Sequence, residues 1–220
     1  MSASVNSFDR IAPMYDVLAR IVYGKSIRNS QTHLLEEIEN AEQLLIIGGG
    51  TGWLLKEVLK VNANGKIHYV DASAQMIDHA TRTCNDVSGN RVEYVHGTEE
   101  LLPRKPVFDA VIANFYFDLF PDEKLLQVLD RIVSALKPNA ILLVSDFRNT
   151  NSWWSSVLLG LMYRFFRLVS NIQASRLPQW QKVLRRKGFK ESKTGFFYNG
   201  FIQSSRYDLM KSIQVDKYFA

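Results

Sequence analysis

The sequence predicts a single-domain α/β protein with a largely parallel β-sheet that ends in an antiparallel hairpin. Short apolar runs alternate with amphipathic segments from residue 43 to residue 147, which is typical of consecutive β-α-β units. The dipeptide Asn199-Gly200 separates two β-rich runs and predicts a tight hairpin turn. A length of 220 residues, 46% of them hydrophobic, provides enough chain for one domain with a sizeable core.

Five apolar runs predict the parallel part of the sheet. The first, at residues 43–47, ends in glycines and is typical of a strand buried on both faces. The other strands are expected at 66–70, 91–95, 107–113 and 140–147, with helices over 51–61, 73–84 and 122–136. We expect Asp122 to be the N-cap of the last helix and Lys137-Pro138-Asn139 to end it. This order implies parallel strands joined by right-handed crossovers.

The single domain, residues 1–220, divides into four segments. In chain order these are a helical cap at 1–42 with helices near 7–23 and 26–40, an α/β core at 43–150, a helical insertion at 151–177, and, at 178–220, a helix ended by Gly188 and followed by the hairpin. The cap adds to the sheet rather than forming a second domain.

Charge is distributed unevenly along the chain. Residues 1–150 hold 15 Lys and Arg against 19 Asp and Glu, a net charge of −4. Residues 151–220 hold 12 against 3, a net charge of +9. A basic last third is compatible with an anionic partner such as nucleic acid, phospholipid or an acidic substrate, and equally with a solvated basic face.

Cysteine and histidine usage narrows the class of protein further. Cys84 is the only cysteine, so an intramolecular disulfide is excluded. The first residues lack the basic and apolar regions of a signal peptide, and we therefore expect a cytoplasmic protein. The four histidines show no metal-ligand spacing, so no metal site is expected.

The strongest functional signal is the segment 44–54, LLIIGGGTGWL, in which Gly48, Gly50 and Gly52 follow a buried strand. Glycines at alternate positions let the backbone turn sharply and approach a ligand closely. The next strand ends in Asp71, where a carboxylate would meet the ribose hydroxyls of a nucleoside cofactor. The alternative is a plain tight turn, with Asp71 as the N-cap of the following helix. Trp53 at the third position of G-x-G-x-x-G argues against a dinucleotide fingerprint.

These segments resemble the motifs of class I S-adenosylmethionine (SAM)-dependent methyltransferases. GGGTG is similar to their first motif, and the resemblance continues in order through YVDASAQMIDHA (69–80), HGTEELLP (96–103), FDAVIANFYFDLF (108–120) and LKPNAILLVSDF (136–147). FDRIAPMYD (8–16) further resembles the start of methyltransferases that act on ubiquinone and menaquinone precursors. The resemblance implies a Rossmann-like, seven-stranded sheet of five parallel strands plus the C-terminal antiparallel hairpin, with helices on both faces and SAM as cofactor.

The resemblance also implies which residues bind SAM. It places the glycine loop, Gly48, Gly49, Gly50, Thr51 and Gly52, beside the methionine moiety and Asp71 on the ribose. Ala72 and Met76 would line the adenine, and Thr98 or Glu99 would contact its amino group. Asn114 and Phe115 would lie near the sulfonium, and Tyr15 of the cap would close over the cofactor. Two positions depart from the pattern. Ile46 stands where the family often has an acidic partner for the cofactor's amino group, and Asn139 replaces a usual glycine.

Methyl transfer leaves little imprint in a sequence, because the sulfonium is already activated and positioning supplies much of the rate. Where the acceptor must lose a proton, the candidate bases are Asp146, Tyr116 and Asp16. A structural hydrogen bond at a cap or loop is the alternative role for each. The run 114–117 lacks the paired prolines typical of DNA amino-methyltransferases, so no DNA partner is expected.

The insertion at 151–170 is strongly apolar but too short, with its late arginines, to span a membrane. It is either a helix packed on the core or the wall of a lipophilic acceptor site. In the second case residues 151–176 also suit a membrane surface, with Arg164, Arg167 and Arg176 at the polar edge. We therefore expect methyl transfer to a small hydrophobic or aromatic acceptor. The competing functions are a non-catalytic SAM-binding module, an RNA methyltransferase and an NAD-dependent oxidoreductase.

Overall fold

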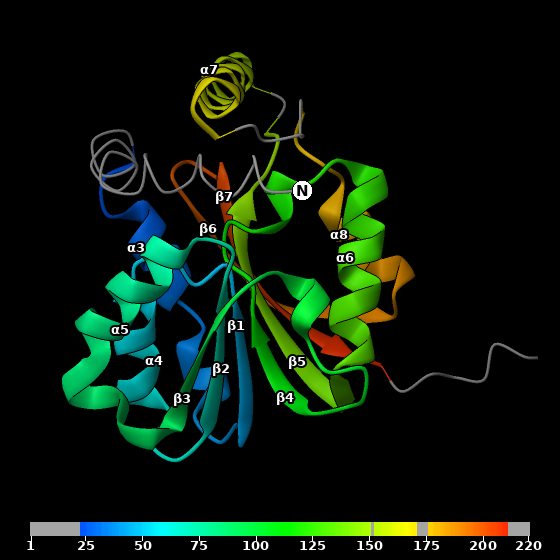
Figure 1. The fold of residues 1–220 in the computed structure, drawn as a ribbon. Helices are drawn as coiled ribbons and strands as arrows, with labels where there is room; N and C mark the ends of the chain where they lie inside the picture. The colour runs from blue at the N-terminus through cyan, green and yellow to red at the C-terminus, as the bar shows by residue number, and fades with distance from the viewer. Residues whose placement is uncertain (1–22, 151, 171–175, 211–220) are drawn as a thin grey trace, which may run out of the picture.

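The computed structural model describes residues 23–150, 152–170 and 176–210, and its centre is one seven-stranded sheet (Figure 1). The strand order is β3-β2-β1-β4-β5-β7-β6. The strands are β1 Gln43–Ile47, β2 Lys66–Asp71, β3 Val92–His96, β4 Phe108–Ile112, β5 Leu136–Phe147, β6 Phe189–Phe197 and β7 Ile202–Leu209. The first five are parallel, and β7 pairs antiparallel with both β5 and β6. The predicted fold class is confirmed.

Helices cover both faces of this sheet. They are α3 Ser26–Thr32, α4 Trp53–Val61, α5 Ala74–Ser88, α6 Asp122–Ser134, α7 Trp153–Ser170 and α8 Trp180–Arg186, with short 3-10 turns η1 Leu35–Ile38, η2 Gly89–Arg91, η3 Glu99–Leu101 and η4 Phe117–Leu119. Figure 1 shows α3, α4 and α5 on one face, and α6 and α8 on the other. The helix α7 lies apart from both layers, beyond the ends toward which the parallel strands run.

The strand β1 shows why the apolar runs of this sequence become central strands. Leu45 and Ile47 pack into the cluster beneath α6 and α8, whereas Leu44 and Ile46 pack into the cluster beneath α4 and α5. All four are almost fully buried, because successive side chains of a strand point to opposite faces. Burying each such side chain stabilises the fold by about 1.5–3 kcal/mol. Ile46, the departure from the family pattern, is therefore a core residue.

The start of α6 corrects the prediction for Asp122. The N-cap is Pro121, with no side-chain cap, and Asp122 is the first residue inside the helix. Its carboxylate instead accepts a hydrogen bond from the backbone N–H of Gln179 at 2.9 Å and pairs with Arg176. An acidic side chain in the first turn also suits the helix dipole. Asp122 thus ties the chain before α8 to α6.

Two further boundaries differ from the prediction. The strand β5 begins at Leu136 rather than at residue 140, and its pairing with β4 shifts register near Phe108. Asn139 adopts a φ of 65°, which asparagine tolerates better than most residues, so the strand continues past it. The single helix expected at 26–40 is divided into α3 and η1. The helix expected near 7–23 lies almost entirely outside the described residues.

The hairpin between β6 and β7 confirms the prediction made from Asn199-Gly200. Tyr198, Asn199 and Gly200 all have positive φ, between 48° and 81°. The N–H of Phe201 donates to the carbonyl of Tyr198 at 3.0 Å and closes the turn. No helix among the described residues is long and apolar enough to cross a membrane.

Candidate functional site

The glycine loop leaves β1 through a turn that side chains would obstruct. Gly48, Gly50 and Gly52 have φ values of 67°, 69° and 86°. A Cβ at Gly48 would lie 2.7 Å from the ring of Tyr116, and one at Gly52 would lie 2.7 Å from the Cα of Ala80. At Gly50 a Cβ would meet no atom of the described residues within 4 Å. The loop is therefore packed on the protein at both ends, and none of the described side chains covers its middle.

Asp71, at the carboxyl end of β2, is hydrogen-bonded to this loop. Its Oδ2 accepts from the N–H of Gly50 at 2.8 Å and its Oδ1 from the N–H of Ser73 at 2.9 Å. The hydroxyl of Tyr69 donates to the carbonyl of Gly50 at 2.8 Å and holds the loop from below. The N-cap of α5 is Ser73, whose Oγ accepts from the N–H of Met76. The alternative role of Asp71 as that N-cap is thus taken by Ser73.

The residues expected around the adenine lie at the ends of β2 and β3. The carbonyl of Ala72 accepts from the Nε2 of His96 at 3.1 Å, and this contact joins the two strand ends. The hydroxyl of Thr98 caps η3 by accepting from the N–H of Glu100. Glu99 is buried, and its Oε1 lies 3.7 Å from the Nζ of Lys124. Strand pairing therefore brings Thr98 and Glu99 to the same edge as the glycine loop.

Asn114 and Phe115 follow β4 at this edge. The Oδ1 of Asn114 accepts from the N–H of Ser145 at 2.8 Å, so this side chain joins the ends of β4 and β5. Phe115 has a φ of 49°, which is uncommon for a bulky residue. Its ring centroid lies 5.0 Å from that of Phe147. Strained residues of this kind cluster at functional sites.

The structure does not favour Tyr116 as a base. Its hydroxyl donates to the Oε2 of Glu99 at 2.9 Å, and its ring is almost fully buried against the glycine loop. Burial and the neighbouring Glu99 raise the pKa of Tyr116 well above the usual value for tyrosine. A phenol with a raised pKa keeps its proton at neutral pH. Tyr116 therefore supports the loop and Glu99.

Asp146, the second predicted base, is buried beside Asp118, and we call these two residues the carboxylate pair. The Oδ1 of Asp146 accepts from the N–H of Phe147 at 2.7 Å and its Oδ2 from the N–H of Asp118 at 3.2 Å. The Oδ1 of Asp118 is buried and has no hydrogen-bond partner within the described part of the chain. Burial raises the pKa of Asp118 to about 7, and burial together with Asp118 raises the pKa of Asp146 well above its usual range.

Sequence reasoning missed Asp118. The signal was available, because Asp118 is a single acidic residue within the otherwise apolar run 115–120, directly after a predicted strand. A carboxylate in such a run is either exposed to solvent or buried, and a buried carboxylate with a shifted pKa is a candidate functional group. The remaining candidates, Tyr15 and Asp16, lie outside the described residues.

An aromatic cluster lies beside the carboxylate pair. It joins Tyr23, Phe147, Trp154, Tyr198 and Phe201, which come from four separate parts of the chain. Phe147 is at its centre, with ring centroids 5.5 Å from Tyr23 and 5.3 Å from Phe201. Tyr23, Phe147 and Phe201 are buried, so the cluster forms an aromatic core at the carboxyl end of β5.

The helix α7 covers this cluster with one face. Leu159, Met162 and Tyr163 are buried, and the hydroxyl of Tyr163 donates to the carbonyl of Asp118 at 3.4 Å. Trp153, Val157 and Leu161 point away from the core and are exposed. The insertion therefore has one face packed on the core and a second apolar face outside it.

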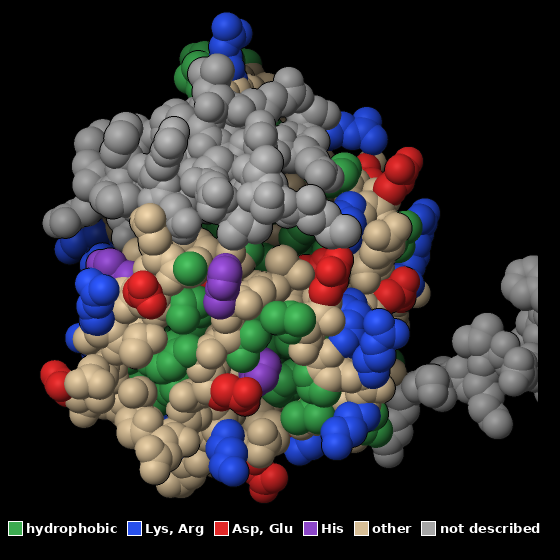
Figure 2. Space-filling model, viewed as in Figure 1, with side chains coloured by type: hydrophobic (Ala, Val, Ile, Leu, Met, Phe, Trp, Pro, Cys, Tyr) green, Lys and Arg blue, Asp and Glu red, His purple; other side chains and the backbone are tan. Residues whose placement is uncertain are grey.

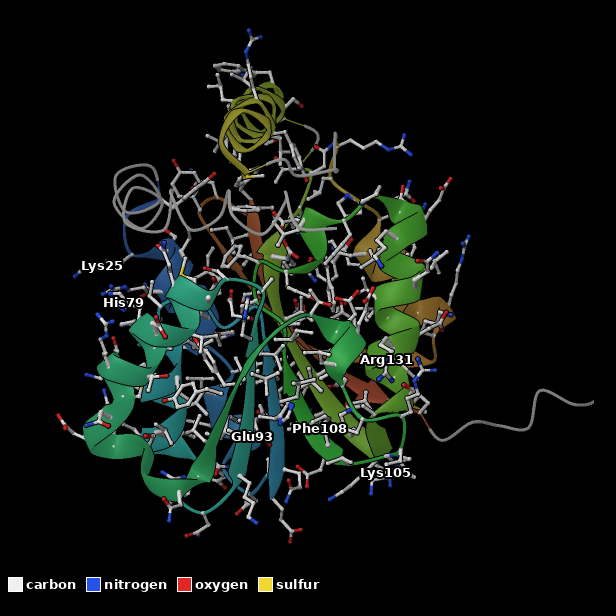
Figure 3. All side chains as sticks on the ribbon, viewed as in Figure 1. Lys25, His79, Glu93, Lys105, Phe108 and Arg131 are labelled. Atoms are coloured by element: carbon white, nitrogen blue, oxygen red, sulfur yellow. The ribbon has the colours of Figure 1, made fainter. Side chains whose placement is uncertain are left out.

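The opposite edge of the sheet offers no comparable chemistry. A hollow of about 390 Å³ lies there and is lined by residues that include Lys66, Arg91 and Phe108. Figure 3 shows Phe108 and Glu93 in the lower part of the sheet, away from α7. Among the described residues no group of three or more His, Cys, Asp or Glu could hold a metal ion.

Known proteins with this sequence pattern are methyltransferases. Residues 45–142 match a family model described as a methyltransferase domain. The malonyl-[acyl-carrier protein] O-methyltransferase of Halalkalibacterium halodurans is 31% identical over 149 residues, which cover 64% of this chain and 53% of that protein. The demethylmenaquinone methyltransferase of Thermotoga maritima is 28% identical over 163 residues, covering 72% and 66%. The chain spans about half the length of the curated relatives it matches.

A solved structure supports the fold. The chain aligns with the 1,6-didemethyltoxoflavin-N1-methyltransferase of Burkholderia thailandensis with a TM-score of 0.68 at 15% identity. That structure contains bound 1,6-didemethyltoxoflavin and S-adenosylhomocysteine. The alignment covers 95% of this chain and 89% of that one. At this identity the likeness establishes the fold alone, a Rossmann-like sheet with helices on both faces.

Proposed function

Because this chain belongs to the class I SAM-dependent methyltransferases, whose cofactor is SAM, we propose that it methylates a small hydrophobic or aromatic acceptor. The observation that carries the proposal is the juxtaposition at one sheet edge of the Gly50 loop, Asp71 and the aromatic cluster around Phe147. The loop and Asp71 suit the cofactor, and the cluster suits an apolar acceptor.

The residues at the strand ends fit SAM. None of the described side chains covers Gly50, so a ligand can approach the loop closely there, and the carboxylate of Asp71 can accept from ribose hydroxyls. Ala72, Met76 and Thr98 would line the adenine, while Asn114 and Phe115 would lie nearer the sulfonium. Glu99 bonds Tyr116 in this structure, so Thr98 is the better placed of the two for the adenine amino group.

The chemistry requires alignment more than activation. Bound SAM supplies an activated methyl group, and the bond from the acceptor atom to carbon forms as the sulfur–carbon bond breaks. The buried aromatic surface orients a flat acceptor and excludes water. Where the acceptor must lose a proton, we propose Asp118 as the group that takes it, since a carboxyl with a pKa of about 7 suits proton exchange at neutral pH.

Two acceptor chemistries come from the names of the relatives. One relative acts on demethylmenaquinone and the other on a malonyl group carried by a protein. The aromatic cluster of this chain favours a quinone-like ring. RNA stays an alternative because residues 151–220 carry a net charge of +9.

The test is methyl transfer from radiolabelled SAM. The chain would be incubated with a reduced naphthoquinone, with a malonyl-[acyl-carrier protein] and with total RNA, and label counted in each. Label in the quinone supports the proposal, whereas label only in RNA contradicts the acceptor class. SAM binding without transfer to any acceptor of a cell extract identifies a non-catalytic module.

A further inference from the structure

The outer face of α7 carries an apolar stripe that the fold does not use. Trp153, Val157 and Leu161 are 80%, 54% and 62% exposed. Their spacing of four residues places them along one side of the helix. The top of Figure 2 shows hydrophobic and basic side chains at the surface in the place that α7 occupies in Figure 1. We call these three residues the outer stripe.

The stretch of sequence that contains the outer stripe carries charge of a single sign. Between Asp146 and Glu191 the sequence contains no acidic residue, and it contains these basic ones: Arg148, Arg164, Arg167, Arg176, Lys182, Arg185, Arg186, Lys187 and Lys190. Two of them, Arg176 and Lys187, pair with Asp122 and Asp130 of α6. On α7 itself, Arg164 is exposed three residues after Leu161. An apolar face bordered by basic side chains is the pattern of a helix that lies on an anionic lipid surface.

We propose that α7 docks on an anionic membrane surface through the outer stripe, with Arg164 at the lipid phosphates. The helix cannot cross the membrane, so it lies in the plane of the interface. A second copy of this chain is a less suitable partner for the outer stripe. A stable protein–protein interface buries about 800 Å² on each partner, and the three side chains of the stripe offer well under that area.

The position of α7 gives this docking a consequence for the acceptor, and this step rests on the proposed function. The inner face of the helix packs on the aromatic cluster, with Tyr163 bonded to the carbonyl of Asp118. If α7 lies on the membrane, the acceptor site lies next to the lipid in which a lipophilic acceptor is dissolved. The substrate class is therefore an acceptor that partitions into membranes.

Vesicle binding tests the docking without any assay of methyl transfer. The full chain would be mixed with vesicles of phosphatidylcholine alone or with phosphatidylglycerol added, and the bound fraction measured by flotation. We expect binding to the anionic vesicles, reduced at least roughly tenfold in the variant Trp153→Ser/Val157→Ser/Leu161→Ser. Arg164→Gln should weaken binding to the anionic vesicles and leave the neutral ones unaffected.

The control is Val87→Ser/Met210→Ser, which replaces two apolar side chains outside α7 that are 50% and 53% exposed, and it should bind like the parent. Unchanged melting temperatures would show that all variants fold. Equal binding by the triple variant and the parent, or no binding to anionic vesicles, would overturn the proposal. So would a dimer in sedimentation equilibrium that the triple variant abolishes. Membrane binding without methyl transfer would leave the docking standing and refute only the proposed function.

Discussion

At the scale of single residues, the proposed site contains side chains that contact the glycine loop and would also contact or support the binding of SAM. Asp71 accepts from the N–H of Gly50 and would also accept from the ribose. Tyr116 packs on Gly48 while it donates to Glu99. Substitution at such positions changes both the local backbone and the binding of the cofactor, so each prediction needs a control that separates the two effects.

Asp71→Ala should weaken SAM binding roughly 10- to 150-fold, because hydrogen bonds to a charged group contribute about 1.5–3 kcal/mol. Calorimetric titration with SAM measures the change. Asp78→Ala, which removes an exposed carboxylate from α5, is the matched control and should bind normally. Normal SAM affinity in Asp71→Ala would show that Asp71 serves the loop alone.

Two glycine variants should separate packing from ligand approach. Gly52→Ala places a Cβ 2.7 Å from the Cα of Ala80, so it should destabilise the fold by several kcal/mol. The added Cβ of Gly50→Ala meets no atom of the described residues within 4 Å, so the expected cost is the strain of the positive φ, about 1–2 kcal/mol. It should nevertheless weaken SAM binding. Urea unfolding and SAM titration of both variants measure the two effects, and equal stability losses would contradict this account.

The buried carboxylate pair should make stability depend on pH. The pKa of Asp118 is about 7 in the folded protein and near 3.9 in the unfolded chain. Between these values the folded state binds a proton that the unfolded state lacks, so the free energy of unfolding falls as the pH rises. In the parent the free energy of unfolding should fall between about pH 5 and pH 7, and Asp118→Asn should make this fall smaller by roughly 2 kcal/mol. Urea unfolding at both pH values measures it, and an unchanged pH dependence would exclude a proton on the pair.

At the scale of elements, α7 combines two apolar faces with different roles. Trp154 contacts Tyr198 and Phe201, whereas its neighbour Trp153 is exposed. Of the two alternatives that the sequence left open for residues 151–170, a helix packed on the core describes the inner face, and the acceptor wall or membrane-surface helix stays a prediction. The inner face is core, and the outer face stays available for a partner.

Trp154→Ser should lower the free energy of unfolding by roughly 3 kcal/mol or more, because it opens a cavity beside the aromatic cluster. Trp153→Ser should change it by less than about 0.5 kcal/mol, as surface substitutions do. Thermal melts of the two variants provide the comparison. Similar melting temperatures would show that the inner face of α7 contributes little to the fold.

At the scale of the whole molecule, the sheet brings the carboxyl ends of β1, β2, β3 and β4 to one edge, where we propose a single cofactor site. The chain should bind one SAM per monomer and should not bind NAD, because the loop has the spacing G-x-G-x-G and Trp53 at the third dinucleotide position. Calorimetry with both ligands tests this. NAD binding without a SAM response would contradict the assigned cofactor.

The sequence by itself determined the fold class, five parallel strands in order, the hairpin and the glycine loop with Asp71. These features depend on local patterns, namely apolar periodicity, turn residues and glycine spacing. Contacts with residues distant in the chain seldom change the structure that such patterns favour. The sequence misplaced the role of Asp122, because that role depends on a partner distant in the chain, the N–H of Gln179. It left two roles open for Tyr116, a base or a structural hydrogen bond, and the bond to Glu99 favours the second.

Only the tertiary structure decided which polar groups are buried together and which apolar groups are not. Asp118 and Asp146 are 28 residues apart in the chain and meet because β4 and β5 end side by side. Trp153 and Trp154 are adjacent and chemically alike, yet helix geometry places them on different faces. Burial raises the pKa of a carboxyl group, and it decides whether an apolar side chain packs on the core or faces solvent. Burial depends on the whole folded chain, so the local sequence does not determine it.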